Sequence, residues 1–139
     1  MILIDATNTI LGRMAVHAAK YALEGQKVVV INCEKAYISG SKKNVFDEYL
    51  HRLERGTYKK GPFLHRMPDK IVRRTIRGML PFKKATGREA YKRVFCYVGV
   101  PEEYKNEKPV ELKNVKINKL PTLKYVDLLT LSKRLGAKI

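Results

Sequence analysis

The sequence predicts an α/β protein with about four mostly parallel strands and helices on both faces of the sheet. Two aliphatic runs, at residues 2–4 and 28–31, flank a segment whose apolar residues recur at helical spacing. Continuous apolar strands joined by a helix are typical of a parallel βαβ unit. The chain has 139 residues, of which 45% are hydrophobic, so we expect one domain over residues 1–139 with a sizeable core.

The helix of this βαβ unit is predicted between the two aliphatic runs. Asp5 ends the first strand, and Thr9 is the expected N-cap of the helix. Gly25 follows the last turn, where glycine is the commonest residue. The apolar face of the helix consists of Leu11, Met14, Ala15, Ala18, Ala22 and Leu23.

A second helix is predicted to begin after Ser41, whose hydroxyl suits an N-cap, and to end at Gly56. Its apolar face consists of Val45, Phe46, Tyr49, Leu50 and Leu53. The sequence GTYKKGPFLHRMP, residues 56–68, comes next. Its glycines and prolines predict a loop.

A third helix is predicted from Pro68, a residue favoured in the first turn, to Pro81, which stops it. One face is mainly apolar and consists of Ile71, Val72, Thr75, Ile76 and Met79. The opposite face stacks four cations at spacings i, i+3, i+4 and i+7, namely Lys70, Arg73, Arg74 and Arg77. Like charges at this spacing destabilise an isolated helix, so we expect an anionic partner such as phosphate to compensate.

The rest of the chain completes the α/β pattern. A short helix is predicted after Thr86, followed by a strand at residues 94–98. Residues 101–121 contain three prolines among polar residues, which predicts an irregular connection. A fourth strand is expected at residues 123–126, and Asp127 is expected to cap a last helix. That helix would bury Leu128, Leu131 and Leu135 and end at Gly136.

Charge is the most unusual property of the sequence. There are 29 basic and 13 acidic residues, a formal net charge of +16, whereas a small domain usually carries a charge of magnitude ~2–8. Residues 51–99 hold 14 of the basic and three of the acidic residues, so most of the excess lies in the middle third. The asymmetry predicts a polyanion-binding region, at about residues 55–93, on a nearly neutral scaffold.

Nucleic acid and an anionic membrane surface are the two candidate polyanions, and binding to nucleic acid is the favoured interpretation of this charge. Membrane spanning is excluded because the longest aliphatic run, residues 28–31, is far too short, and MILID at the N-terminus does not suggest a signal peptide. Arginine gives bidentate phosphate contacts, while lysine acts as a point charge. The candidate RNA-binding residues are Lys42, Lys43, Lys59, Lys60, Arg66, Lys70, Arg73, Arg74, Arg77, Lys83, Lys84 and Arg88.

Two short segments add detail to this interpretation. Tyr58, Phe63 and His65 place aromatic rings among cations, which suits stacking on unpaired bases; the alternative for Phe63 is that it folds back into the core. The GSKK sequence at residues 40–43 lacks the spacing of a nucleotide-binding loop. As a helix N-terminus it suits a single RNA phosphate, or it is an ordinary helix cap.

Metal and disulfide chemistry are not expected. Cys33 and Cys96 belong to no CxxC pair, so free thiols in a reducing cytosol are favoured over a disulfide. None of the three histidines has a partner at metal-ligand spacing. We therefore expect no cofactor and no metal.

Four segments carry a resemblance to a known family. They are LGRMA at residues 11–15, INCEKAYISGSK at 31–42, PDKIVRRTIRGMLP at 68–81, and Gly87-Arg88 leading into VFCYVG at 94–99. In this order the chain resembles the universal large-subunit ribosomal protein family conventionally numbered thirteen, and its length resembles the shorter, archaeal-type members. Cys96 departs from the family pattern, which usually has an aliphatic residue there.

The resemblance implies a three-layer α/β/α domain with four parallel strands in the order 3-2-1-4. It also implies a structural role in the large ribosomal subunit, where the protein binds and helps fold ribosomal RNA (rRNA) without catalysis. The implied partners are large-subunit rRNA and neighbouring ribosomal proteins, with no membrane and no small-molecule substrate. The implied location is the cytoplasmic ribosome.

Two other function classes stay open on the sequence alone. Asp5, Glu34 and Asp127 would lie near the carboxyl ends of parallel strands, where ligands bind in such sheets. They offer a carboxylate cluster for an RNA-processing enzyme, although capping of the helices that follow explains Asp5 and Asp127. A basic DNA-compacting or repressor protein is the third class, but no helix-turn-helix spacing supports it.

Overall fold

The computed structural model describes all 139 residues and contains two small sheets. The larger sheet has three parallel strands in the order β1-β2-β4, namely β1 (Ile2–Asp5), β2 (Val28–Ile31) and β4 (Val94–Cys96). The smaller sheet pairs β3 (Tyr37–Ser39) with β5 (Tyr125–Asp127) in antiparallel orientation. The α/β class and the parallel βαβ unit are therefore confirmed.

The expected four-stranded sheet is wrong in its fourth strand. The first three predicted strands are neighbours in the expected order, but β5 pairs with β3, with Tyr37 opposite Asp127. The backbone N–H of Leu128 donates to the Ala36 carbonyl at 2.9 Å, which holds this end of β5 beside the chain that leads into β3. The outer edge of β1 meets the irregular segment instead, where the Val110 N–H donates to the Leu3 carbonyl at 2.8 Å.

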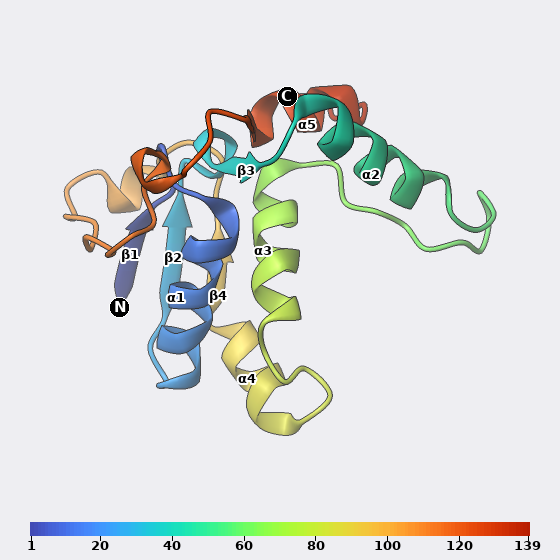
Figure 1. Cartoon of the computed structure of the whole chain (residues 1–139). Coiled ribbons are helices and arrows are strands. Elements are labelled where there is room, and N and C mark those ends of the chain that lie inside the picture. The colour runs from blue at the N-terminus through green and yellow to red at the C-terminus, as the bar shows by residue number, and fades with distance from the viewer.

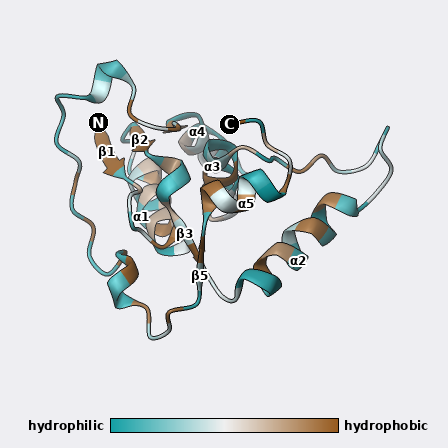
Figure 2. Cartoon of the chain, turned by 90° about the horizontal axis from the view of Figure 1, so that it is seen from above, coloured by the Kyte–Doolittle hydropathy of each residue, from teal (hydrophilic) through white to brown (hydrophobic).

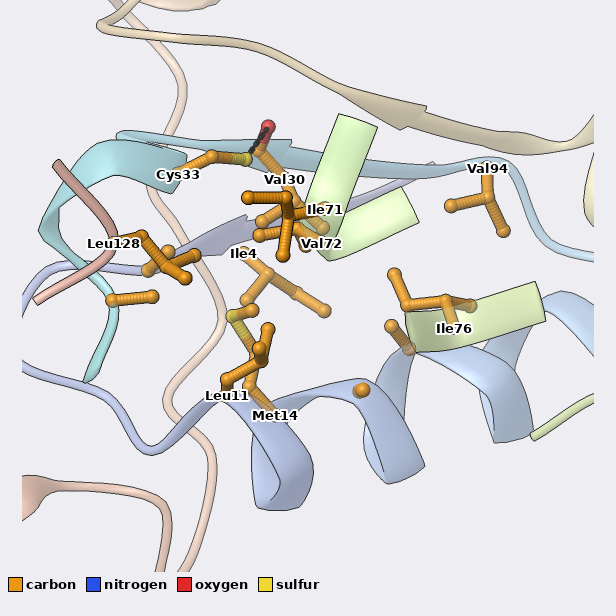
Figure 3. Close-up of a cluster of buried hydrophobic side chains, with 14 of the residues drawn as sticks. Ile4, Leu11, Met14, Val30, Cys33, Ile71, Val72, Ile76, Val94 and Leu128 are labelled. Atoms are coloured by element: carbon orange, nitrogen blue, oxygen red, sulfur yellow. Dashed lines mark hydrogen bonds between the residues drawn. The ribbon is translucent and has the colours of Figure 1, made fainter. Parts of the chain in front are cut away.

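Alternate residues of the parallel strands face two different surroundings. One face, which includes Ile4, Val30 and Val94, belongs to the main core and is covered by α1 (Leu11–Leu23) and α3 (Pro68–Gly78) (Figures 1 and 3). The other face forms a small cluster of Leu3, Val29, Ile31 and Tyr104. Tyr104 comes from a short 3-10 helix, η2 (Glu102–Tyr104). The irregular segment, and not a layer of α-helices, covers this second face of the sheet. The expected three-layer arrangement with helices on both faces is therefore not found.

Several helix ends follow the sequence signals. The Ser41 hydroxyl accepts from the Asn44 N–H at 3.3 Å at the start of α2 (Lys42–Glu54), and Pro68 occupies the first turn of α3. The Asp127 carboxylate accepts from the Thr130 N–H at 3.2 Å and so caps α5 (Leu128–Arg134). These caps are confirmed because each side chain satisfies, or in the case of proline removes, a backbone donor that the helix leaves unpaired.

Two predicted caps are wrong. The N-cap of α1 is Ile10, while the Thr9 hydroxyl donates to the Ala6 carbonyl at 2.7 Å within the preceding turn. The N-cap of α4 (Ala85–Lys92) is Lys84 rather than Thr86. In both places the helix begins next to a residue without a capping side chain, so tertiary packing sets the boundary.

The α2 helix and the loop after it extend away from the rest of the molecule (Figures 1 and 2). Val45 is the one buried residue of α2, and the other large apolar side chains of the helix are partly buried against the main core. The remaining elements are two short 3-10 helices, η1 (Cys33–Lys35) and η3 (Ile117–Lys119). None of the helices has the length and apolar character that crossing a membrane requires.

Candidate nucleic-acid interface

The structure distributes the twelve predicted RNA-binding cations over three consecutive parts of the chain. Ten of them are exposed, and Arg73 and Arg77 are half-buried. Lys42 and Lys43 begin α2; the loop carries Lys59, Lys60 and Arg66; α3, the following turn and α4 carry Lys70, Arg73, Arg74, Arg77, Lys83, Lys84 and Arg88.

The charge of this surface is not neutralised within the molecule. The chain forms two ion pairs, Arg52 with Glu48 and Lys105 with Glu102, and neither involves one of the twelve cations. Residues 51–99 contain three acidic side chains against 14 basic ones. The excess positive charge therefore faces outward, where it attracts a polyanion.

The cationic face of α3 divides into two kinds of arginine. The Arg73 Nε donates to the Val94 carbonyl at 3.1 Å, and its guanidinium lies 4.4 Å from the centroid of the Tyr91 ring. The Arg77 guanidinium lies 3.9 Å from the centroid of the Phe82 ring, which meets Tyr91 edge-on. Arg74 is exposed and forms no hydrogen bond within the chain. Two of the predicted contact residues thus also hold α3 against β4 and α4.

The loop places its aromatic residues in solvent. The side chains of Tyr58 and Phe63 are 86% and 75% exposed. The alternative that Phe63 folds back into the core is therefore wrong. His65 is exposed as well, and the Lys59 ammonium lies 5.6 Å from the Tyr58 ring.

A hollow of about 310 Å³ lies between α2, the loop and α3. Its charged wall includes Arg52, Arg55 and Arg74, together with His65, and Phe63 lines it as well. The predicted set does not include Arg52 and Arg55 of this wall, although the sequence HRLER at residues 51–55 was a signal for two further cations. Arg52 lies in α2 and Arg55 directly follows it, so their place beside residues of α3 depends on how α2 is positioned.

The three carboxylates of the enzyme alternative do not form a cluster. The Asp5 carboxylate accepts from the Thr7 N–H at 2.9 Å and from the Asn32 amide at 3.1 Å, and Glu34 accepts from the Gly99 N–H at 3.0 Å. Asp127 caps α5. No group of three or more histidine, cysteine or acidic side chains is placed to hold a metal ion.

The environment of Asp5 also argues against acid–base work. Burial alone would raise the pKa of this carboxyl, but hydrogen bonds from Thr7 and Asn32 and the charge of Lys116 together lower it below its usual value. The side chain is therefore an anion that accepts hydrogen bonds and closes the turn after β1. A general acid at neutral pH needs the opposite shift.

The two cysteines are free thiols, as expected. Cys33 is buried in the main core, and its Sγ lies 3.7 Å from the Val30 carbonyl oxygen, which accepts its hydrogen bond (Figure 3). Its pKa is raised, first by the interaction with the neighbouring Cys96 thiol and second by burial. Both effects keep the Cys33 thiol protonated and unreactive.

The fold and the charge define a basic α/β protein whose twelve candidate cations form no ion pairs within the chain. The chain matches the family model of ribosomal protein L13 over residues 1–103, and it belongs to this family. It is 43% identical to the "Large ribosomal subunit protein uL13" of Methanococcoides burtonii over 138 residues, 99% of each chain. It is 47% identical to the protein of the same name from Methanopyrus kandleri over 135 residues, 96% of this chain and 85% of that one. The resemblance seen in the sequence is confirmed, including its archaeal type.

Proposed function

We propose that this chain is a structural constituent of the large ribosomal subunit that binds and helps fold large-subunit rRNA, with no catalysis of its own. The carrying observation is that the twelve cations, ten of them exposed, lack ion-pair partners on a folded α/β body. The family and the names of the relatives support the ribosomal setting. Neighbouring ribosomal proteins are the other expected partners, and the ribosome is the expected location.

Recognition on this proposal is mainly of the RNA backbone and shape. Lysines along the loop and the turn after α3 act as point charges, which position phosphates without reading sequence. The duplex parts of rRNA have an A-form major groove too narrow for side chains, so contact through phosphate and ribose is the available mode. The core fixes the position of the cations on α3, because α1 and α3 pack together on the parallel sheet.

Crosslinking in cells tests this function. Cells are irradiated with ultraviolet light, the protein is purified under denaturing conditions, and the attached RNA and crosslinked peptides are sequenced. We expect large-subunit rRNA, with most crosslinked peptides inside residues 55–93 and few in α1, which serves as the internal control. Crosslinks spread over messenger or transfer RNA would contradict the ribosomal assignment.

Competition binding addresses the DNA-compacting alternative. The purified chain is titrated with a labelled fragment of large-subunit rRNA in the presence of duplex DNA or of unlabelled rRNA fragment. We expect rRNA to compete at a much lower concentration than DNA. Equal competition would favour a general DNA-binding protein and would contradict the proposal.

A further inference from the structure

Three arginines differ from all others in the chain. The sequence contains 10 arginines and 19 lysines. Seven of the arginines engage a carbonyl, a carboxylate or an aromatic ring of the chain itself, namely Arg13, Arg52, Arg73, Arg77, Arg88, Arg93 and Arg134. Arg55, Arg66 and Arg74 engage none, and all three are exposed.

These three arginines surround one aromatic side chain. Phe63 lines the hollow of about 310 Å³ together with Arg55 and Arg74. It also lines a neighbouring hollow of about 490 Å³ together with Arg55 and Arg66. Both volumes fall within the ~300–1,000 Å³ range of small-ligand sites. Phe63 is 75% exposed, so its ring is available to a ligand.

The chemistry of the two hollows is that of arginine rather than lysine. No lysine lines either hollow, although lysines outnumber arginines in the chain, and Lys59 and Lys60 lie in the same loop. The guanidinium fork binds phosphate or a base edge bidentately and stacks on planar rings, which an ammonium group does not do. Glu54 is the one acidic residue in the lining, and it lies in the second hollow only.

We propose that the two hollows around Phe63 bind unpaired nucleotides of the RNA partner. A base stacks on the Phe63 ring, and Arg55, Arg66 and Arg74 hold the adjacent phosphates and base edges. Stacking needs bases that are not already paired and stacked in a duplex, so this site selects single-stranded RNA, whereas the lysine surface binds any phosphate backbone. The inference rests on the proposed RNA-binding function and adds a class of nucleotide and a location to it.

Binding of two RNA probes to the full chain tests the proposal. The probes are a short labelled oligouridine, which has no stable pairing, and a labelled, fully paired RNA hairpin. Phe63→Leu keeps an apolar side chain but removes the ring, and Phe95→Leu on β4 is its matched control. We expect Phe63→Leu to weaken oligouridine binding about tenfold, a loss within the ~1–3 kcal/mol range of base stacking, and to change hairpin binding less than twofold.

A charge-preserving variant separates guanidinium chemistry from net charge. Arg55→Lys with Arg74→Lys keeps the charge of +16, and Arg13→Lys with Arg134→Lys changes two exposed arginines outside the two hollows. We expect about a fivefold loss for oligouridine with the first pair, little change for the hairpin, and no change for either probe with the second pair. Far-ultraviolet circular dichroism checks that all variants are folded.

Different results would overturn the nucleotide site and the RNA-binding function. Loss of equal size for both probes, or no loss for oligouridine, would overturn the nucleotide site while leaving RNA binding intact. Failure of the unmodified chain to bind either RNA would overturn the proposed function itself. Tight binding of polyglutamate that oligouridine does not displace would also overturn the site, because it would assign the hollows to an acidic protein segment.

Discussion

The basic surface has two halves that use the same residue types differently. In the packed half, Arg73 and Arg77 lie on the rings of Tyr91 and Phe82, and these aromatic side chains are themselves half-buried against the body. In the open half, Arg74 and the solvent-exposed ring of Phe63 line the same hollow. Charge and spacing predict the same role for all of these arginines. The difference is that residues from the turn after α3 and from α4 pack against Arg73 and Arg77, while no other element covers Arg74.

The return of α4 onto α3 and α1 creates the packed half. Gly87 in α4 lies so close to the Pro81 carbonyl that an added Cβ would overlap it. This contact fixes the turn that carries Phe82 between Arg77 and Tyr91. The loop after α2 has no such contact with the body, so its cations and rings stay available to a partner.

The largest expected effect comes from closing the space at Gly87. Gly87→Ala places a methyl group against the backbone of Pro81, so α4 must shift, and we expect a loss of about 3 kcal/mol in the free energy of unfolding. Gly12→Ala in α1 is the control, since nothing lies within 4 Å of its added Cβ; it should stabilise by about 0.5–1 kcal/mol. Urea denaturation measures both. Equal effects of the two changes would contradict the importance of the Gly87 contact.

The next effect separates two neighbouring arginines of α3. Arg73→Ala removes the hydrogen bond to the Val94 carbonyl and the contact with Tyr91, and we expect it to cost about 2 kcal/mol of stability. Arg74→Ala removes an exposed side chain without an internal partner and should change stability by less than about 0.5 kcal/mol. Urea denaturation of the two variants side by side decides the point. A similar loss of unfolding free energy in both variants would show that Arg73 and Arg74 contribute equally to stability and would contradict the prediction.

A salt series measures the open half directly. Each phosphate contact contributes about −0.7 to −0.9 to the slope of log affinity against log salt, so Lys70→Ala with Arg74→Ala should make the slope shallower by about 1.5 on an rRNA fragment. Lys108→Ala with Lys113→Ala removes the same charge from the irregular segment and should leave the slope nearly unchanged. If both pairs make the slope shallower by the same amount, RNA affinity depends on the net charge of the chain and not on the position of the cations.

Local signals in the sequence predicted most of the fold. Aliphatic runs and helical spacing correctly placed the three parallel strands and all five helices, because burial on one or both faces leaves a periodic pattern. The three-residue strand β3 was missed, since so short a segment has no detectable period. The partner of β5 was also missed, because pairing depends on where distant segments meet and not on the sequence of either strand.

The sequence predicted the cations of the candidate site, but not which of them pack against aromatic rings of the chain and which stay free. Counting charges found the segment, and helical spacing found the four cations of α3. Neither could show that Arg73 lies on the Tyr91 ring, because that ring belongs to α4 and reaches Arg73 only when α4 packs in the folded protein. Arg55 was missed for a related reason, because it directly follows the end of α2 and lines a hollow with residues of α3 only in the folded protein.

The smallest expected effect concerns pH and belongs to the body, because the group with a lowered pKa lies at the end of β1. The pKa of Asp5 is lowered because the hydrogen bonds from Thr7 and Asn32 and the charge of Lys116 outweigh the effect of burial. A carboxyl whose pKa is lower in the folded state stabilises the fold above its unfolded pKa. That contribution is lost as the pH falls through the folded value.

Asp5→Asn therefore gives a difference in unfolding free energy that depends on pH. At pH 7 the unmodified chain should be the more stable, and the difference should shrink as the pH falls below the usual carboxyl value of 3.8. Urea denaturation at pH 7 and near pH 3 measures this, with Glu107→Gln on the exposed irregular segment as the control. A difference that stays constant with pH would mean that shape, and not charge, holds the turn after β1. RNA binding tested at pH 7 should be equal in the two chains, because this turn lies outside the basic surface.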